Sequence, residues 1–455
     1  MIRIVTVCND SIITRLWFAA HFAAAFLKMK KQKEIYVMTN NTANGASCWR
    51  TRLRAMGPGI MMASAAVGGS HIIASTQAGA LYGWQLALII ILANLFKYPF
   101  FRFGPQYTLE TGKSLLEGYA EKGRIYLWVF FLMNLFATII NTAAVSVLCA
   151  AILSFVLPIG WSVNVLSAAV LASAVVLLLV GPYRTVDAVS KIIMISLTVT
   201  TVAAVAVAAS NGAAVKPGFI EPNPWNLGAL AFIVALMGWM PAPIEISAIN
   251  SMWVATKRKL EHVSYEDGLF DFNVGYISTA LLALVFLALG ALVQYGSGIE
   301  LKMSGAAYIG QLIDMYASTI GEWSHWLVTF IAFACMYGTT LTVLDGYSRT
   351  NMESFRLLLK GERSTNRIFA VWVVFAAVAG LCVVLFFKGA VLAMLKFAMI
   401  ASFVSTPVFA WLNLSLVRKG RHALQPWLMW LAWVGLLYLS GFAVLFLLNQ
   451  SGLVA

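Results

Sequence analysis

Charged residues are scarce in this chain. Asp, Glu, Lys and Arg make up 11% of its 455 residues, whereas 61% of the residues are hydrophobic. Soluble domains carry about 25% charged residues, so the composition excludes a water-soluble protein of this length. Lipid must be the solvent for most of the chain, which predicts a membrane protein.

Acidic residues are the rarer charge type, with 18 against 31 Lys and Arg, and the formal net charge is +13. An excess of basic residues also occurs in proteins that bind nucleic acid. Here, however, the basic residues lie in short loops between apolar runs, which is the pattern of membrane topology. We therefore expect no nucleic-acid partner.

Cysteines and catalytic motifs are sparse as well. The five cysteines form no C-x-x-C pair and three of them lie inside apolar runs, so no disulfide framework is expected. The sequence has no nucleophile motif, no phosphate-binding loop and no paired carboxylates typical of a catalytic cleft. It predicts no enzyme, no catalytic residues and no cofactor.

Apolar runs long enough to cross a bilayer recur along the chain, since a crossing helix needs about 20 apolar residues. We predict eleven spans, at 57–83, 85–104, 125–156, 161–181, 187–209, 226–256, 269–296, 323–348, 367–387, 389–417 and 426–448.

The loops between these spans predict the orientation. With the N-terminus in the cytoplasm, the inner loops carry sixteen Lys and Arg, and the outer loops carry only Lys216, Lys302 and Lys388. One miscounted span would invert every later loop and destroy this asymmetry. We therefore expect a multi-pass protein of the cell membrane (inner or plasma) with a cytoplasmic N-terminus and an outer C-terminus.

Residues 1–56 precede the first span and are expected to be an N-terminal cytoplasmic extension. The apolar stretch 11–27 is short for a span and contains Arg15 and His21. An interfacial helix is one interpretation; an upstream extension without a role in the fold is the other, because Met38 begins a polar lead into the first span. Residues 1–37 are left out of the fold prediction.

Two of the spans contain helix breakers. The first span has Gly-Gly-Ser-His at 68–71, and the span 226–256 has Met-Gly-Trp-Met-Pro-Ala-Pro at 237–243. The second would be about 46 Å long as one straight helix, which is too long for a single crossing. Unwound backbone at membrane depth survives only where it is buried or lines a cavity, so the breaks indicate a substrate site.

The breaks fall five spans apart, which predicts two inverted five-helix repeats. The first repeat would comprise 57–209 (helices 1–5) and the second 226–417 (helices 6–10), with 426–448 appended as helix 11. Two unrelated kinks, caused by glycine and by proline, are the alternative.

The first span and its exit resemble the NRAMP divalent-metal transporters without a gap. The matching residues are Gly57-Pro58-Gly59 and Gly79-Ala80-Leu81-Tyr82-Gly83, supported by Thr111-Gly112, Met240-Pro241, Gly346 and Pro407. The resemblance covers about residues 50–450. It implies an all-α polytopic membrane protein of the LeuT-type fold, with helices 1 and 6 broken. It also implies transport of divalent transition metals such as manganese and iron, usually with protons.

The sequence departs from the family at its ion-binding motifs. Where members have Asp-Pro-Gly-Asn, residues 68–71 read Gly-Gly-Ser-His, and Ala242 stands in place of the histidine of Met-Pro-His. Helix 3 lacks the family's carboxylates and has a neutral stripe of Asn134, Thr138, Asn141 and Thr142. The chain therefore resembles a divergent member, and we expect transport that is weakly coupled or not coupled to protons.

The remaining chemistry predicts a neutral metal shell. His71 and Met240 are the candidate side-chain ligands, because imidazole and thioether suit transition metals. Ser70 and the carbonyls of Gly68 and Met237 would complete the shell. For His71 the alternative is a hydrogen-bonded packing residue, and for Met240 an ordinary apolar side chain.

Charge compensation would have to come from a nearby carboxylate. Glu245 is the first candidate, unless it pairs with Lys97 or Lys396 within the membrane. Asp345 is either part of the inner exit path or the partner of Arg349 one helical turn away. Asn141 and Thr142 are the candidates for lining the pathway.

Three functions remain open on the sequence. The first is a secondary transporter of divalent metal cations; the second is a LeuT-fold carrier of a small organic solute such as an amino acid, favoured by the lost carboxylates and the intramembrane lysines. A sensor without transport activity is the third. We expect the partners to be a divalent metal ion and the lipid bilayer, and the protein to function as a monomer.

Overall fold

The computed structural model describes residues 56–453 except 181–182, 262, 303–304, 362–365 and 418–424, and it also describes Arg52. All regular structure in these described ranges is helical. The predictions for the N-terminal extension fall outside the described residues, apart from Arg52 and Met56.

Eight uninterrupted helices in the described ranges are long and apolar enough to cross a membrane. They are α5 (Ala87–Thr111), α7 (Arg124–Val156), α8 (Val163–Val180), α12 (Tyr265–Val293), α14 (Ser324–Leu358), α15 (Asn366–Phe386), α16 (Val391–Val417) and α17 (Pro426–Gln450). Each coincides with a predicted span.

The other three predicted spans are also present as helices. The span 187–209 is α9 (Tyr183–Asn211), and the two spans with breakers are interrupted. The first consists of α3 (Pro58–Ala66), the π-helix η1 (Ser70–Ser75) and α4 (Thr76–Tyr82). The span 226–256 consists of α10 (Leu227–Gly238) and α11 (Ile246–Leu260). Both predicted breaks are therefore confirmed.

Two helices were not predicted, α6 (Leu115–Lys122) and α13 (Gly305–Ile320). Helix α6 is too short to cross a bilayer, and it begins with a capping box in which Ser114 and Glu117 each satisfy the backbone of the other. Helix α13 has 16 residues and carries Gln311 and Asp314 among its apolar residues. Neither has the long apolar run on which the search for spans depended.

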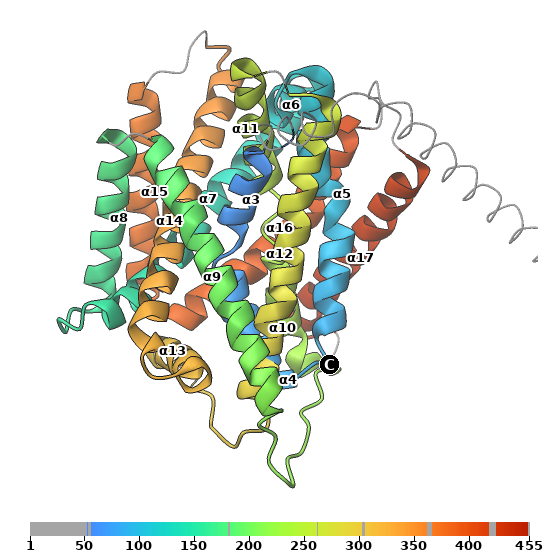
Figure 1. Ribbon diagram of the computed structural model, residues 1–455. Coiled ribbons are helices and arrows are strands. Elements are labelled where there is room, and N and C mark those ends of the chain that lie inside the picture. The colour runs from blue at the N-terminus through green and yellow to red at the C-terminus, as the bar shows by residue number, and fades with distance from the viewer. Residues whose placement is uncertain are drawn as a thin grey trace, which may run out of the picture. The chain divides into compact units, whose positions relative to one another are not determined.

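The two broken helices run in opposite directions through the bundle (Figure 1). Helices α3 and α11 lie in the upper half of the view, and α4 and α10 lie in the lower half. The chain thus descends through the first break and ascends through the second, as expected for two halves of opposite topology.

Helix α12 packs closely against the first broken helix. A Cβ atom on Gly59 would lie 2.2 Å from the carbonyl oxygen of Asp271, and one on Gly79 would lie 2.0 Å from that of Leu287. Small residues allow backbones to approach in this way between membrane helices. The carboxylate of Asp271 also accepts hydrogen bonds from the backbone N–H groups of Gly57 and Gly59, at 3.1 and 2.7 Å. It therefore satisfies donors at the start of α3.

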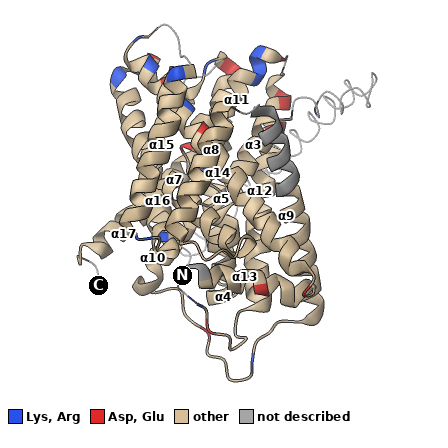
Figure 2. Cartoon of the chain, turned by 90° about the vertical axis from the view of Figure 1, so that its left-hand side faces the viewer, with Lys and Arg blue, Asp and Glu red and all other residues tan. Residues whose placement is uncertain are grey.

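The basic side chains are distributed unevenly over the bundle. Figure 2 shows Lys and Arg concentrated at the end where α11 terminates, and few at the opposite end. The last turn of α11 contributes Lys257, Arg258 and Lys259 to this end. The loops predicted to be cytoplasmic thus gather at one end of the molecule.

Candidate functional site

The first break begins where α3 ends at Ala66. Val67 follows with extended backbone (φ −76°, ψ 99°), and Gly68 and Gly69 lead into the π-helix at Ser70. A Cβ atom on Gly69 would lie 3.0 Å from the ring of Trp239, so the absence of a side chain lets the second break approach. Short π-helical segments of this kind are frequent at functional sites.

The second break separates Gly238, the last residue of α10, from Ile246, the first residue of α11. Pro241 and Pro243 provide no backbone N–H, so this segment cannot continue the helix. Its peptide bond between Met240 and Pro241 is cis.

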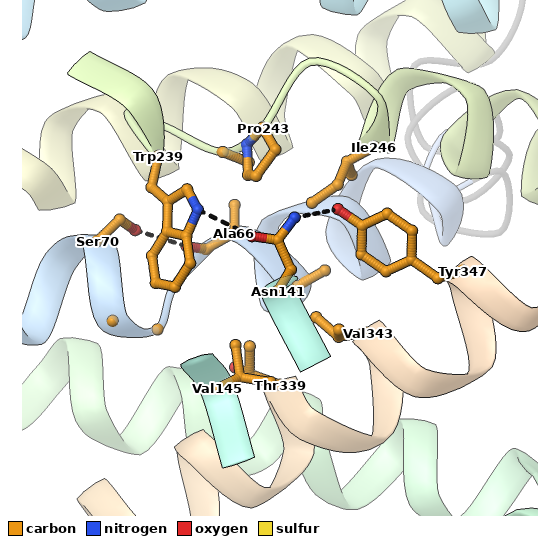
Figure 3. Close-up of a pocket in the computed structure, with 14 residues that line it drawn as sticks. Ala66, Ser70, Asn141, Val145, Trp239, Pro243, Ile246, Thr339, Val343 and Tyr347 are labelled. Carbon is orange, nitrogen blue, oxygen red and sulfur yellow. Dashed lines mark hydrogen bonds between the residues drawn. The ribbon is translucent and has the colours of Figure 1, made fainter. Parts of the chain in front are cut away.

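A small cavity of about 30 Å³ lies between the two breaks (Figure 3). It is enclosed by the end of α3 and the first break, by α7, by the linker from α10 to α11 with the first residue of α11, and by α14. The lining residues are Ala65, Ala66, Gly68, Gly69, Ser70, Asn141, Val145, Trp239, Ala242, Pro243, Ile246, Thr339, Val343 and Tyr347.

Asn141 of α7 is the centre of a hydrogen-bond network beside this cavity. Its Oδ1 accepts from the indole Nε1 of Trp239 at 3.2 Å and from the hydroxyl of Ser402 at 3.3 Å. Its Nδ2 donates to the hydroxyl of Tyr347 at 2.8 Å, and Figure 3 shows Asn141 between the tryptophan and the tyrosine. The network thus joins α7, α14, α16 and the second break.

Glu245 ends the network and is the N-cap residue of α11. Its Oε1 accepts from Tyr347 at 2.9 Å and from the Nδ2 of Asn141 at 3.3 Å. Its Oε2 is buried, and no hydrogen-bond partner for it is found in the described part of the chain. A carboxylate at a helix N-terminus interacts favourably with the helix dipole. The unpartnered oxygen leaves one acceptor site open within the protein interior.

His71 is fully buried and does not line the cavity. Its Nε2 donates to the carbonyl of Thr279 on α12 at 2.9 Å, and its Nδ1 lies 2.8 Å from the hydroxyl of Ser70. The imidazole ring also packs edge-on against Phe286. Both ring nitrogens are thus engaged, and the arrangement corresponds to the packing alternative rather than to a metal ligand.

Only some of the other residues predicted for the metal shell line the cavity. Gly68 and Ser70 line the cavity, whereas Met237 and Met240 are buried elsewhere in the core. The carbonyl of Met237, expected to be free, accepts a hydrogen bond from the ammonium of Lys97 at 2.6 Å. The predicted shell of His71, Met240 and the Met237 carbonyl is therefore not assembled in this conformation.

Asp345 and Thr142 also lie away from the cavity. Asp345 forms an ion pair with Arg349 at 2.8 Å, which is the pairing that the four-residue spacing indicated. The hydroxyl of Thr142 is buried, and the described residues offer it no hydrogen-bond partner. Of the predicted pathway residues, Asn141 alone reaches the cavity.

Three cavity residues with polar side-chain atoms were not predicted: Trp239, Thr339 and Tyr347. Trp239 lies inside the second break, so its position between Gly238 and Met240 was a usable signal. Thr339 and Tyr347 are on α14, eight residues apart and hence on one helix face. Nothing in the pattern of that long apolar span indicated which face meets the breaks.

The atoms at the cavity that can coordinate a cation are oxygens. They come from the hydroxyls of Ser70, Thr339 and Tyr347 and from the amide of Asn141, with the Glu245 carboxylate behind them. Within the described ranges, no three His, Cys, Asp or Glu side chains are grouped so that they could hold a metal. Any cation bound here would have mainly neutral oxygen ligands.

The chain is similar in sequence to proteins from two bacteria. Its sequence is 63% identical over 409 residues to an uncharacterized protein of Pasteurella multocida, covering 89% of this chain and 94% of that protein. It is 24% identical over 296 residues, 61% of each chain, to the divalent metal cation transporter MntH of Latilactobacillus sakei.

Solved structures share the fold. A mutant of the manganese transporter from Eremococcus coleocola superposes with a TM-score of 0.66 at 13% identity, over 90% of this chain and 89% of that chain. MhsT in complex with L-phenylalanine superposes with a TM-score of 0.57 at 13% identity, over 85% and 98%. These likenesses confirm the LeuT-type fold. Residues 59–449 match the family described as natural resistance-associated macrophage protein-like, and the chain belongs to this NRAMP family.

Proposed function

We propose that this protein is a secondary transporter that carries divalent metal cations across a membrane by alternating access. The observation that supports this proposal most is the cavity enclosed by both helix breaks, with the carboxylate of Glu245 behind its lining residue Tyr347. In this fold the substrate binds where broken helices expose polar groups at membrane depth. Membership of the NRAMP family supports the same cargo.

The size of the cavity favours an ion over an organic solute. A water molecule needs at least about 10–15 Å³ of such space, so about 30 Å³ holds one or two particles of that size. Sites for organic ligands typically enclose about 300–1,000 Å³. An amino acid would require the walls of this cavity to separate, whereas a dehydrated metal ion would not.

Glu245 would provide the charge that the neutral lining lacks. A divalent ion that leaves water needs compensation by an opposite charge inside the protein. Glu245 is not itself a lining residue, but its Oε1 accepts from Tyr347, which is, and its Oε2 has no partner among the described residues. Asn141 and Tyr347 hold the other carboxylate oxygen and so fix the position of the group.

We propose that the protein lies in the cell membrane with a cytoplasmic N-terminus and an outer C-terminus. The gathering of Lys and Arg at one end of the bundle supports this orientation. The repeat boundaries 57–209 and 226–417, with 426–448 appended, are part of the same proposal. Function as a monomer is likewise part of this proposal.

Uptake into proteoliposomes tests the proposed cargo. Wild-type protein should accumulate Mn²⁺, and Glu245→Gln should lower uptake at least tenfold, because it removes the compensating charge and keeps the shape. Glu353→Gln is the matched control, since Glu353 pairs with Arg356 on α14 and lies outside the cavity. Uptake of labelled amino acids without any uptake of Mn²⁺ would establish the organic-solute alternative instead.

A further inference from the structure

Lys97 lies fully buried in the middle of α5, ten residues after its first residue. Ten residues of helix extend about 15 Å, so the ammonium is near the centre of a hydrocarbon layer about 30 Å thick. A charged group at this depth is costly and is retained for a function, so its partners are informative.

The partners of Lys97 are all backbone carbonyls of the second break. Its Nζ donates to the carbonyls of Met237 at 2.6 Å, Gly238 at 2.8 Å and Ala242 at 3.4 Å. An ammonium has three N–H donors, so these bonds use its full donor capacity. Two of the acceptors belong to the last residues of α10, where a helix lacks intrahelical partners for its carbonyls.

The end of α10 therefore has the features of a cation site. A helix C-terminus carries about half a negative charge, and the ends of broken helices coordinate monovalent cations in transporters of this kind. Here the occupant is attached to the chain. Glu245 stands at the opposite side of the break, as the N-cap residue of α11. A basic and an acidic side chain thus stand at the two ends of the break.

We propose that Lys97 is a tethered cation at the C-terminal end of α10, where it takes the place of a soluble monovalent cation. Its ammonium holds the linker between α10 and α11 in place. Because Ala242 also lines the substrate cavity, Lys97 positions one wall of that cavity without lining it. Its role in uptake rests on the proposed function, whereas its role as a cation at the break does not.

Chemical rescue tests this assignment. Lys97→Ala opens a space beside three carbonyls, which a small cation such as methylammonium can enter. Lys97→Met also removes the charge but fills the space, so a soluble cation cannot replace it. Lys396→Ala is the control, because Lys396 also lies within a predicted span but its side chain is exposed. Melting midpoints in detergent and Mn²⁺ uptake are measured with choline, Na⁺ or methylammonium as the monovalent cation.

In choline, Lys97→Ala and Lys97→Met should melt at least about 5 °C below wild type and take up Mn²⁺ at least tenfold more slowly. Methylammonium should raise the melting midpoint and the rate of Mn²⁺ uptake of Lys97→Ala. It should raise neither quantity for Lys97→Met, for wild type or for Lys396→Ala. Lys97→Met that melts like wild type would overturn the assignment, as would Lys97→Ala that stays unaffected by methylammonium.

If the Lys97→Ala variant fails to fold, two other measurements still test the assignment. Wild-type uptake that is unchanged when choline replaces Na⁺ supports the tethered cation, whereas uptake that requires Na⁺ overturns it. The melting comparison of Lys97→Met with wild type needs no transport. It therefore decides on Lys97 even where absent Mn²⁺ uptake has refuted the proposed cargo.

Discussion

The hydroxyl of Tyr347 donates to the Oε1 of Glu245 at 2.9 Å and accepts from the Nδ2 of Asn141 at 2.8 Å. One hydroxyl on α14 therefore connects the second helix break to α7. Because all three groups are buried, the position of the carboxylate depends on both partners.

Removal of this hydroxyl tests its role directly. Tyr347→Phe leaves the ring in place and costs the carboxylate its shortest hydrogen bond, so we expect Mn²⁺ affinity to fall about 10–100-fold, the range for groups that orient metal ligands. Titration calorimetry on purified protein measures the change. Tyr337 is on the same helix as Tyr347, and its hydroxyl donates to Ser173 on α8. The control variant Tyr337→Phe should therefore bind Mn²⁺ as wild type does. Equal losses in both variants would count against a specific role.

His71 is expected to affect stability more than binding. His71→Ala removes two buried hydrogen bonds, to the carbonyl of Thr279 and to the hydroxyl of Ser70, each worth about 0.5–1.5 kcal/mol. The melting midpoint in detergent should fall, while Mn²⁺ affinity changes less than about threefold. A loss of affinity above tenfold at unchanged stability would instead restore His71 as a metal ligand.

The positions of the membrane helices could be predicted because apolar length and loop charge are properties of the sequence alone. The two breaks could be predicted for the same reason, since glycine and proline act locally. Side-chain partners could not. Whether His71 faces the cavity or Thr279 depends on how η1 turns after Gly69, and that turn is set by tertiary packing.

Lys97 illustrates the same limit. The sequence identifies it as an intramembrane charge, and a carboxylate is the obvious partner for such a group. Its hydrogen bonds go instead to carbonyls that become available because α10 ends at Gly238. A partner created by the end of another helix has no signature in residue composition.

Gly238 should tolerate no side chain. A Cβ atom there would lie 1.9 Å from the carbonyl oxygen of Met399 on α16, so Gly238→Ala must displace the backbone at the break. We expect a loss of several kcal/mol, on the order of the larger overpacking effects of about 3 kcal/mol. Gly441→Ala on α17 is the control, because nothing lies within 4 Å of the added atom. It should be neutral or stabilise by up to about 1 kcal/mol. Thermal unfolding of both variants decides the matter, and equal stability would contradict the close contact.

The proposed orientation predicts which loops react with reagents outside the cell. In a variant without native cysteines, a cysteine in place of Lys259 at the end of α11 should resist a membrane-impermeant maleimide in intact cells. A cysteine in place of Ser451, just beyond α17, should react. Permeabilised cells provide the control for reactivity at both positions. Labelling of position 259 from outside would refute the eleven-span orientation.

The donor atoms at the cavity predict the order of ion preference. Hydroxyl, amide and carboxylate oxygens suit hard ions such as Mg²⁺ and Mn²⁺, whereas Cd²⁺ gains most from sulfur. Sequence analysis made Met240 the soft ligand, but its side chain is buried outside the cavity lining. We therefore expect Cd²⁺ to bind no more tightly than Mn²⁺.

Competition binding with Met240→Ala separates the two interpretations. If the thioether does not contact the ion, the ratio of Cd²⁺ to Mg²⁺ affinity should be the same in the variant and in wild type. Stability should fall by about 2–5 kcal/mol, the usual cost of truncating a buried methionine. If the thioether moves to the ion during transport, Cd²⁺ affinity should fall at least tenfold relative to that of Mg²⁺, because magnesium gains nothing from sulfur. Only the ratio distinguishes these cases, since loss of packing at the break would weaken the binding of both ions together.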